Sequence, residues 1–246
     1  MFRVLAVLCL LLLASCSSKT IDQTELDPAV IHFQEGEQAF ESGLYQDAIA
    51  SWEKVRESYY SPELTTLAEF KIAEAYFLGE DYVEASVAFE EFLKNYPGHA
   101  RSADVLYQLG IAYTRQMRSP DQDQGPTRRA LNAFRVLKQS FPDDPRNAEA
   151  ETYIANSLKQ LAASELSVAR FYYKTKHYEA AASRLEGVIT NYPNFESMDE
   201  VYLYLGQAYL KNGAREKASE AFNTLFKQFA GSEHIETAQE FIDKNF

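Results

Sequence analysis

Residues 82–97 read YVEASVAFEEFLKNYP, and residues 178–193 read YEAAASRLEGVITNYP. Both stretches open on a tyrosine, carry an alanine three positions later and a bulky apolar residue four positions after that alanine, and close on Tyr-Pro. Apolar residues at this spacing predict an amphipathic helix, and the proline marks the end of that helix. A motif that returns in the second half of the chain indicates an internal repeat, and a repeat decides the fold.

The same pattern occurs five times between Phe33 and Phe246. Each unit has a first helix that ends in an aromatic residue and, after a short turn, a second helix with the alanine and the bulky residue. The first helices are expected to end near Phe40, Tyr76, Tyr113, Tyr172 and Tyr209. The second helices carry the pairs Ala48 and Trp52, Ala85 and Phe89, Ala130 and Phe134, Ala181 and Leu185, and Ala218 and Phe222.

This unit resembles the tetratricopeptide repeat, a helix–turn–helix of about 34 residues. One helix pair cannot bury its apolar face alone, so stacked pairs share one continuous core. We therefore expect an all-α tetratricopeptide-repeat superhelix of about five repeats. The expected repeats cover approximately residues 30–62, 63–98, 99–145, 146–194 and 195–246.

The spacing between units is uneven, and this unevenness predicts local features. Residues 115–127 (RQMRSPDQDQGPT) are polar and rich in Pro and Gly, which predicts a loop between the two helices of the third repeat. The fourth repeat has room for a long first helix, from about Arg146 to Tyr173. Glycine tolerates the left-handed conformation that follows a helix end. We expect that role at the turn glycines Gly43, Gly79 and Gly213.

The first fifteen residues have the features of a secretory leader. Arg3 precedes a short apolar run, and residues 13–16 read LASC, with small residues before a cysteine. The run is far shorter than the roughly 20 residues that a membrane-spanning helix needs. The tetrapeptide resembles the bacterial lipobox, which implies cleavage after residue 15 and lipid attachment to Cys16. The alternatives are an ordinary signal peptide, or an apolar leader with a chance cysteine. Residues 16–27 (CSSKTIDQTELD) are polar and predict a flexible tether.

Cysteine usage agrees with this interpretation. Cleavage before Cys16 removes Cys9, so the mature chain has no cysteine pair and forms no internal disulfide. Two or more acyl chains anchor a protein stably, whereas one binds only marginally. Ser17 stands where an aspartate retains such lipoproteins in the inner membrane. The lipobox resemblance therefore implies the periplasmic face of the outer membrane.

The net charge of −12 argues against nucleic acid as a partner, because phosphate binding needs basic surfaces. The charge is unevenly distributed along the chain. Residues 20–98 hold 17 acidic and 4 basic side chains, whereas residues 99–246 hold 19 and 18. Two interpretations of this difference are open. Either the acidic half presents a solvated acidic face, or the two halves of the chain bind different partners.

We find no pattern of residues that indicates catalysis. The four histidines are scattered, and none has a metal-binding spacing. Phosphate-binding glycine motifs and nucleophile motifs do not occur in the sequence. We therefore expect a non-enzymatic protein with no metal and no cofactor.

One position breaks the repeat pattern. Three residues after the repeat alanine, four of the units have a small residue, whereas the fourth repeat has Arg184. Three interpretations are open: the side chain extends along apolar surface with its head in water, it pairs with Glu165, or it binds a carboxylate on a partner. The small residues are Ser51, Ala88, Ala133 and Ala221.

The order of lipobox, polar tether and five repeats resembles one family, the BamD (ComL) lipoproteins of the outer-membrane β-barrel assembly machine. The most specific stretch is residues 165–193, which contain Ser-Val-Ala-Arg-Phe-Tyr, Arg-Leu-Glu-Gly and the closing Tyr-Pro. Residues 121–124 (DQDQ), ahead of Ala130 and Phe134, also resemble the third repeat of that family.

The resemblance implies a scaffold that binds the periplasmic domains of the central barrel protein, other assembly lipoproteins and unfolded outer-membrane proteins. It implies a partner-binding surface in the C-terminal repeats with Arg170, Arg184 and Glu186, and a client groove in the N-terminal repeats. Two other functions stay open for a tetratricopeptide lipoprotein: a pilotin that assembles a secretin, and an accessory protein of cell-wall synthesis.

Overall fold

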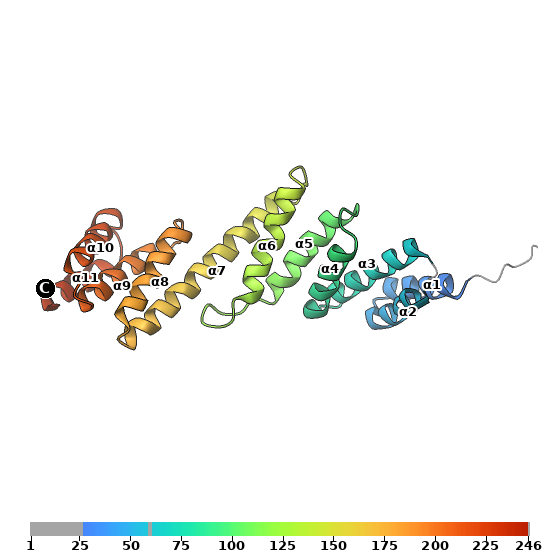
Figure 1. Ribbon diagram of the computed structural model, residues 1–246, viewed down its shortest axis with the longest axis horizontal. Helices are drawn as coiled ribbons and strands as arrows, with labels where there is room; N and C mark the ends of the chain where they lie inside the picture. The colour runs from blue at the N-terminus through green and yellow to red at the C-terminus, as the bar shows by residue number, and fades with distance from the viewer. Residues whose placement is uncertain (1–26, 59–60, 246) are drawn as a thin grey trace, which may run out of the picture.

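The computed structural model describes residues 27–58 and 61–245. These residues form an elongated array of α-helices that runs from the N-terminal end to the C-terminal end of the chain (Figure 1). The described helices are α1 (Pro28–Glu41), α2 (Tyr45–Ser58), α3 (Pro62–Leu78), α4 (Tyr82–Asn95), α5 (Ser102–Arg115), α6 (Gly125–Ser140), α7 (Asn147–Lys174), α8 (Tyr178–Asn191), α9 (Met198–Lys211), α10 (Arg215–Gln228) and α11 (His234–Asn245). The expected signal peptide, Cys16 and the tether up to residue 26 lie outside the described residues.

Local sequence signals set the helix ends. The Asp27 carboxylate accepts a hydrogen bond from the Ala29 amide at 2.8 Å, and the hydroxyl of Ser61 accepts one from the Leu64 amide at 3.0 Å. Each cap residue is followed by a proline, whose missing N–H would be unpaired at that position anyway. Tyr-Pro and Phe-Pro follow the last residues of α4, α6 and α8, where the sequence predicts helix ends.

The helices pack in five consecutive pairs, and each helix contacts the one before it and the one after it. The expected all-α superhelix of about five repeats is confirmed. An eleventh helix, which the sequence pattern did not separate from the fifth repeat, packs on α9 and α10. A terminal helix of this kind covers the apolar face that the last repeat would otherwise expose.

The repeat alanine and its bulky partner are the centre of each pair. All five alanines are fully buried, as are Trp52, Phe89, Phe134 and Leu185, and Phe222 is 2% exposed. In three repeats a first-helix glycine lies directly beneath the partner ring, so a β-carbon there would come within 2.4–2.7 Å of ring atoms. A side chain at these positions would therefore overpack the core. The three close contacts are Gly36 with Trp52, Gly110 with Phe134, and Gly206 with Phe222.

The turn between the two helices has a fixed geometry, and one sequence prediction about it is wrong. Gly43 and Gly213 adopt positive φ as expected, but Gly79 has φ −76°, and Glu80 takes the left-handed conformation instead. In the fourth repeat Lys176 does the same. In these four repeats the left-handed residue lies five positions before the repeat alanine, because the next amide bonds back to the last turn of the first helix.

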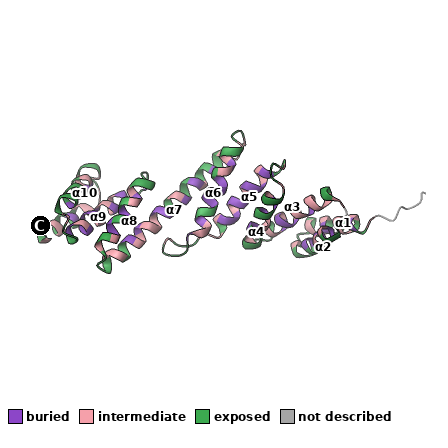
Figure 2. Cartoon of the chain, in the orientation of Figure 1, coloured by how far each residue is buried: buried purple, intermediate pink, exposed green. Residues whose placement is uncertain are grey.

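The long helix expected from about Arg146 to Tyr173 is α7, and it connects the two largest cores. The core of the second and third repeats ends at Leu161, and the core of the fourth and fifth repeats begins at Ala162. Buried residues recur along α7 from Ala150 to Ala169 (Figure 2). Because one continuous helix belongs to both cores, it fixes the spacing between the N-terminal and C-terminal parts of the array.

The polar insertion forms the expected loop between α5 and α6. The Gln116 amide donates to the Tyr82 carbonyl at 2.8 Å, and the Gln160 amide donates to the Arg118 carbonyl at 2.6 Å. Gln124 is buried at the end of the loop, and its amide donates to the Ser119 carbonyl. The loop is therefore held against α4 and α7 by side-chain amides.

Candidate functional site

Arg184 lies on α8 and is held in place without being buried. Its Nη1 is 3.0 Å from Oε2 of Glu165 on α7, and its side chain keeps 47% of its surface exposed. The hydrogen bond to the Glu165 carboxylate raises the pKa of the Arg184 guanidinium. The internal ion pair with Glu165, one of the three interpretations of the sequence, is present in the structure.

The same position differs in the other repeats. Ala133 and Ala221 are buried, and Ser51 and Ala88 are half-buried, so a small residue there faces neighbouring helices. On α8 the corresponding surface is open, and the long arginine side chain reaches Glu165 across it. Arg184 therefore presents a charged group where the other repeats present packing surface.

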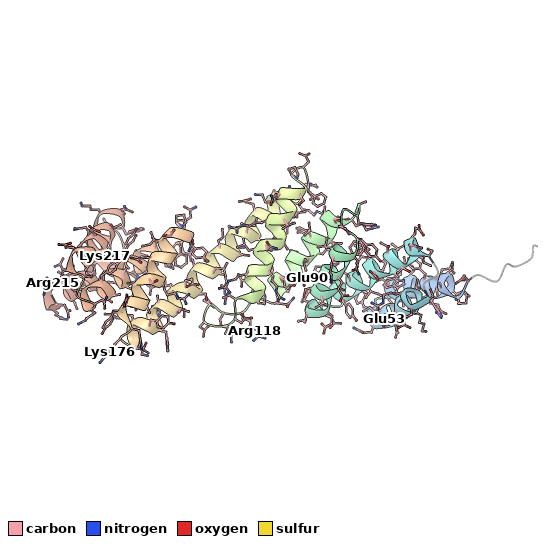
Figure 3. All side chains as sticks on the ribbon, viewed as in Figure 1. Glu53, Glu90, Arg118, Lys176, Arg215 and Lys217 are labelled. Carbon is pink, nitrogen blue, oxygen red and sulfur yellow. The ribbon has the colours of Figure 1, made fainter. Side chains whose placement is uncertain are left out.

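Glu186 borders a groove between α8 and α10. Its carboxylate accepts a hydrogen bond from the Tyr209 hydroxyl, and the Nζ of Lys217 lies 3.9 Å away. The Nζ of Lys217 is also 5.2 Å from the centre of the Tyr209 ring. Figure 3 labels this lysine in the C-terminal part of the array. Burial and the hydrogen bond to Glu186 raise the pKa of Tyr209. The groove, of about 350 Å³, therefore has two acidic side chains, Glu186 and Glu220, and one basic side chain, Lys217, in its lining.

Arg170 does not join this surface. It lies on α7, and its Nη1 is 3.4 Å from Oε1 of Glu200 on α9. Arg170 borders the grooves between α7 and α9, whereas Glu186 borders the groove between α8 and α10. The structure therefore does not bring the three expected partner-binding residues together: Arg184 pairs with Glu165 on α7, Glu186 lines the groove beside α10, and Arg170 pairs with Glu200 on α9.

A further groove lies in the N-terminal repeats, where the resemblance implies client binding. Residues of α3 and of the α4–α5 turn line a space of about 480 Å³ that includes Phe70, Tyr96, His99 and Arg101. The Arg101 guanidinium lies 4.5 Å from the centre of the Phe70 ring. The repeat pattern singles out only Tyr96 among these residues. The Tyr-Pro signal at the end of α4 is the pattern that marks their position.

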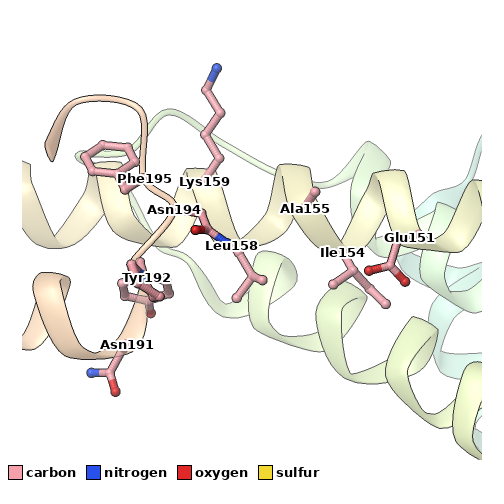
Figure 4. Close-up of a pocket in the computed structure, with 10 residues that line it drawn as sticks. Glu151, Ile154, Ala155, Leu158, Lys159, Asn191, Tyr192, Asn194 and Phe195 are labelled. Carbon is pink, nitrogen blue, oxygen red and sulfur yellow. The ribbon is translucent and has the colours of Figure 1, made fainter.

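A smaller apolar pocket of about 270 Å³ lies beside the middle of α7 (Figure 4). Ile154 and Leu158 of α7 form one wall, and Tyr192 and Phe195 of the α8–α9 turn form the other. Lys159 and Glu196 form an ion pair at 2.7 Å near its edge. This pocket lies where the two main cores meet, and its ring-rich wall comes from the Tyr-Pro turn after α8.

Metal-binding groups and membrane-spanning helices were both sought among the described residues. Residues 27–58 and 61–245 contain no group of three His, Cys, Asp or Glu side chains that could hold a metal ion. In the same part of the chain no helix combines the length and apolarity needed to cross a membrane. The sites that the described residues form are grooves between helices, and such grooves suit the binding of polypeptide segments.

The fold and its grooves define the chain as a tetratricopeptide-like binding scaffold. The chain belongs to the family described as "YfiO: Outer membrane lipoprotein", which matches residues 27–225.

Proteins related to this chain carry a consistent name. The outer membrane protein assembly factor BamD of Caulobacter vibrioides is 26% identical over 98% of this chain and 80% of that protein. The protein of the same name from Neisseria meningitidis serogroup A is 27% identical over 81% of this chain and 79% of that protein. Among solved structures, the match to the protein MamA covers 81% of this chain and 91% of the MamA chain, with 18% identity and a TM-score of 0.37.

Proposed function

We propose that this protein is a lipid-anchored scaffold in the assembly and insertion of β-barrel proteins into the outer membrane. The observation that carries the proposal is the family match, which runs from the start of α1 to Leu225 in α10 and so includes all five helix pairs. The related proteins named outer membrane protein assembly factor support it, because their similarity extends over most of this chain.

In this proposal Cys16 carries the lipid and holds the array at the periplasmic face of the outer membrane. The polar segment of residues 16–27 separates the anchor from α1. The family description as an outer membrane lipoprotein supports this location. The solenoid then needs no membrane segment of its own, because two or more acyl chains suffice for stable anchoring.

The two ends of the array take different partners in this proposal. The C-terminal repeats, which carry Arg184 and Glu186 on α8, bind the periplasmic domains of the central barrel protein. The groove around Phe70 and Arg101 receives unfolded outer-membrane polypeptides. The charge difference between the halves supports two distinct surfaces. The grooves lie between helices that are already folded. Most of the conformational entropy lost on binding is therefore that of the client polypeptide, which becomes ordered.

Replacing Arg184 by alanine is expected to weaken binding of the barrel protein and to leave the fold intact. The ion pair with Glu165 is exposed, and exposed pairs contribute about 0.2–1 kcal/mol to stability, so the melting temperature should fall by only a few degrees. Co-purified barrel protein and circular dichroism melting are the two measurements. Lys244→Ala, which removes another exposed ion pair on α11, is the matched control. A large loss of helicity in Arg184→Ala alone would assign the residue a structural role.

Co-purification from detergent-solubilised membranes tests the proposed function against its two alternatives. The proposal expects a sixteen-strand barrel protein in the eluate. Recovery of a secretin in its place would favour a pilotin, and recovery of a cell-wall synthase would favour an accessory protein of peptidoglycan synthesis. Either of these results, without the barrel protein, contradicts the proposal.

A further inference from the structure

A groove between the first helices of the fourth and fifth repeats has a composition unlike the rest of this acidic protein. It holds about 600 Å³ and is open to solvent. Five of its residues come from α7 and two come from α9. They are Ser167, Arg170, Phe171, Tyr173 and Lys174 of α7, and Tyr204 and Gln207 of α9.

Phe171 is the first sign of a binding role. Its exposed fraction is 62%, larger than that of any other large hydrophobic residue in the described chain. In α3, α5 and α9 the residue directly before the last-turn tyrosine is a fully buried alanine. In α7 that residue is Phe171, and its ring packs only against the neighbouring Tyr172 among described rings, with centroids 6.0 Å apart. The three alanines are Ala75, Ala112 and Ala208.

The charges of the groove are the second sign. Arg170 and Lys174 line it, and none of its lining residues is acidic, although the whole protein has a net charge of −12. Lys174 has no ion-pair partner among the described residues. Arg170 forms an ion pair with Glu200, with Nη1 and Oε1 3.4 Å apart. The adjoining groove also includes Ser167 and Arg170, and its lining contains the acidic residues Glu200 and Asp121. The part of the surface that has cations and no acidic side chain, which we call the cationic section, therefore ends at Arg170. The cationic section is complementary to carboxylates.

Gln207 is the third and independent sign. Its exposed fraction is 7%, it lines the groove, and its side-chain amide forms no hydrogen bond with any described residue. The polar atoms of this amide are not among the enclosed atoms that lack a partner, so they open into the groove, where a ligand or water can bond to them. An amide offers both a donor and an acceptor, which matches the backbone of an extended polypeptide. Burial also raises the pKa of Tyr173 to about 12, so its hydroxyl remains a donor at neutral pH.

We infer that the groove between α7 and α9 binds an extended acidic polypeptide segment that carries an aromatic or aliphatic residue. Carboxylates of the segment pair with Arg170 and Lys174, its apolar side chain covers Phe171, and its backbone bonds to Gln207. This inference deepens the proposed function by naming the chemistry of one partner segment. A single-stranded nucleic acid is the other acidic polymer to consider, and it fits less well, because nucleic-acid surfaces carry clustered Lys and Arg whereas only two cations line this groove.

Fluorescence anisotropy with purified, detergent-solubilised full-length protein tests this inference. The probe is a fluorescein-labelled decapeptide of glycine and serine with four aspartates and one phenylalanine, and the control peptide has asparagines in place of the aspartates. We expect the acidic peptide to bind at least about tenfold more tightly at low salt, with the difference shrinking as salt rises. Phe171→Ala should weaken binding about tenfold, and Lys174→Gln about two- to fivefold.

Lys227→Gln is the matched control, because this exposed α10 lysine lines none of the described grooves and its loss changes the net charge equally. Equal binding of both peptides, or equal affinities for Phe171→Ala and the unaltered protein, would overturn the inference. Tighter binding of a thymidine decanucleotide than of the acidic peptide would also overturn it. The peptide assay uses purified protein alone and does not depend on the barrel protein. A negative result would overturn the inference about the groove, whereas the proposed function is tested separately by co-purification of the barrel protein.

Discussion

Phe134→Ala is expected to lower the free energy of unfolding by about 3–5 kcal/mol. Phe134 is fully buried between the helices of the third repeat. Its ring stacks on Tyr153 with centroids 4.9 Å apart and planes 6° apart, and it lies over Gly110, which has no side chain to fill the space left behind. The substitution therefore leaves a cavity at the centre of the larger core.

Urea unfolding followed by circular dichroism measures this effect. Phe171→Ala is the matched control, because it removes the same side chain from an exposed position and should change stability by less than about 0.5 kcal/mol. Stability in a solenoid is carried by neighbouring repeats, so a broadened or biphasic transition in Phe134→Ala would still agree with this account. Equal stabilities of the two variants would contradict the burial pattern on which the repeats are assigned.

Cys16→Ala is expected to release most of the protein from the membrane. Each buried methylene of an acyl chain contributes about 0.8 kcal/mol, so loss of two or more chains lowers membrane affinity by many orders of magnitude. The expected result is loss of incorporated radiolabelled palmitate and a shift of the protein from the membrane fraction to the soluble periplasmic fraction.

Cys9→Ala provides the control, because Cys9 lies in the leader that the lipobox interpretation expects to be cleaved, and its loss should leave fractionation unchanged. If Cys16→Ala lost the label but stayed with the outer membrane, protein partners rather than lipid would hold the array there. If it kept the label, the lipobox interpretation would be wrong.

The repeat pattern was sufficient to predict the core and most of the helix boundaries. The alanine and its bulky partner are buried between packed helices in every repeat, so the sequence must keep one small and one large residue at a fixed spacing. The long α7 and the insertion loop follow from the same spacing. The turns were less predictable: Glu80 rather than Gly79 is left-handed, because the hydrogen bond back to the first helix sets that position whatever its residue type.

The surfaces were predicted only in part. Arg184 stood out as a residue that breaks the repeat pattern, and the structure adds its ion pair with Glu165. Its separation from Arg170 depends on which helices face each groove, and one-dimensional spacing does not contain that information. Phe171 was open to detection by the same comparison that found Arg184, since the equivalent residues in α3, α5 and α9 are alanines. Gln207 was not, because its burial depends on the packing of α9 against its neighbours.

Depletion of this protein, followed by measurement of porins in the outer membrane, tests the central claim most directly. Expression is placed under a titratable promoter, and outer-membrane porins are quantified while a plasmid copy of the unaltered gene serves as the control. The account predicts that porin levels fall together with the level of this protein and recover with the plasmid copy. Unchanged porin levels after depletion would contradict a role in barrel assembly.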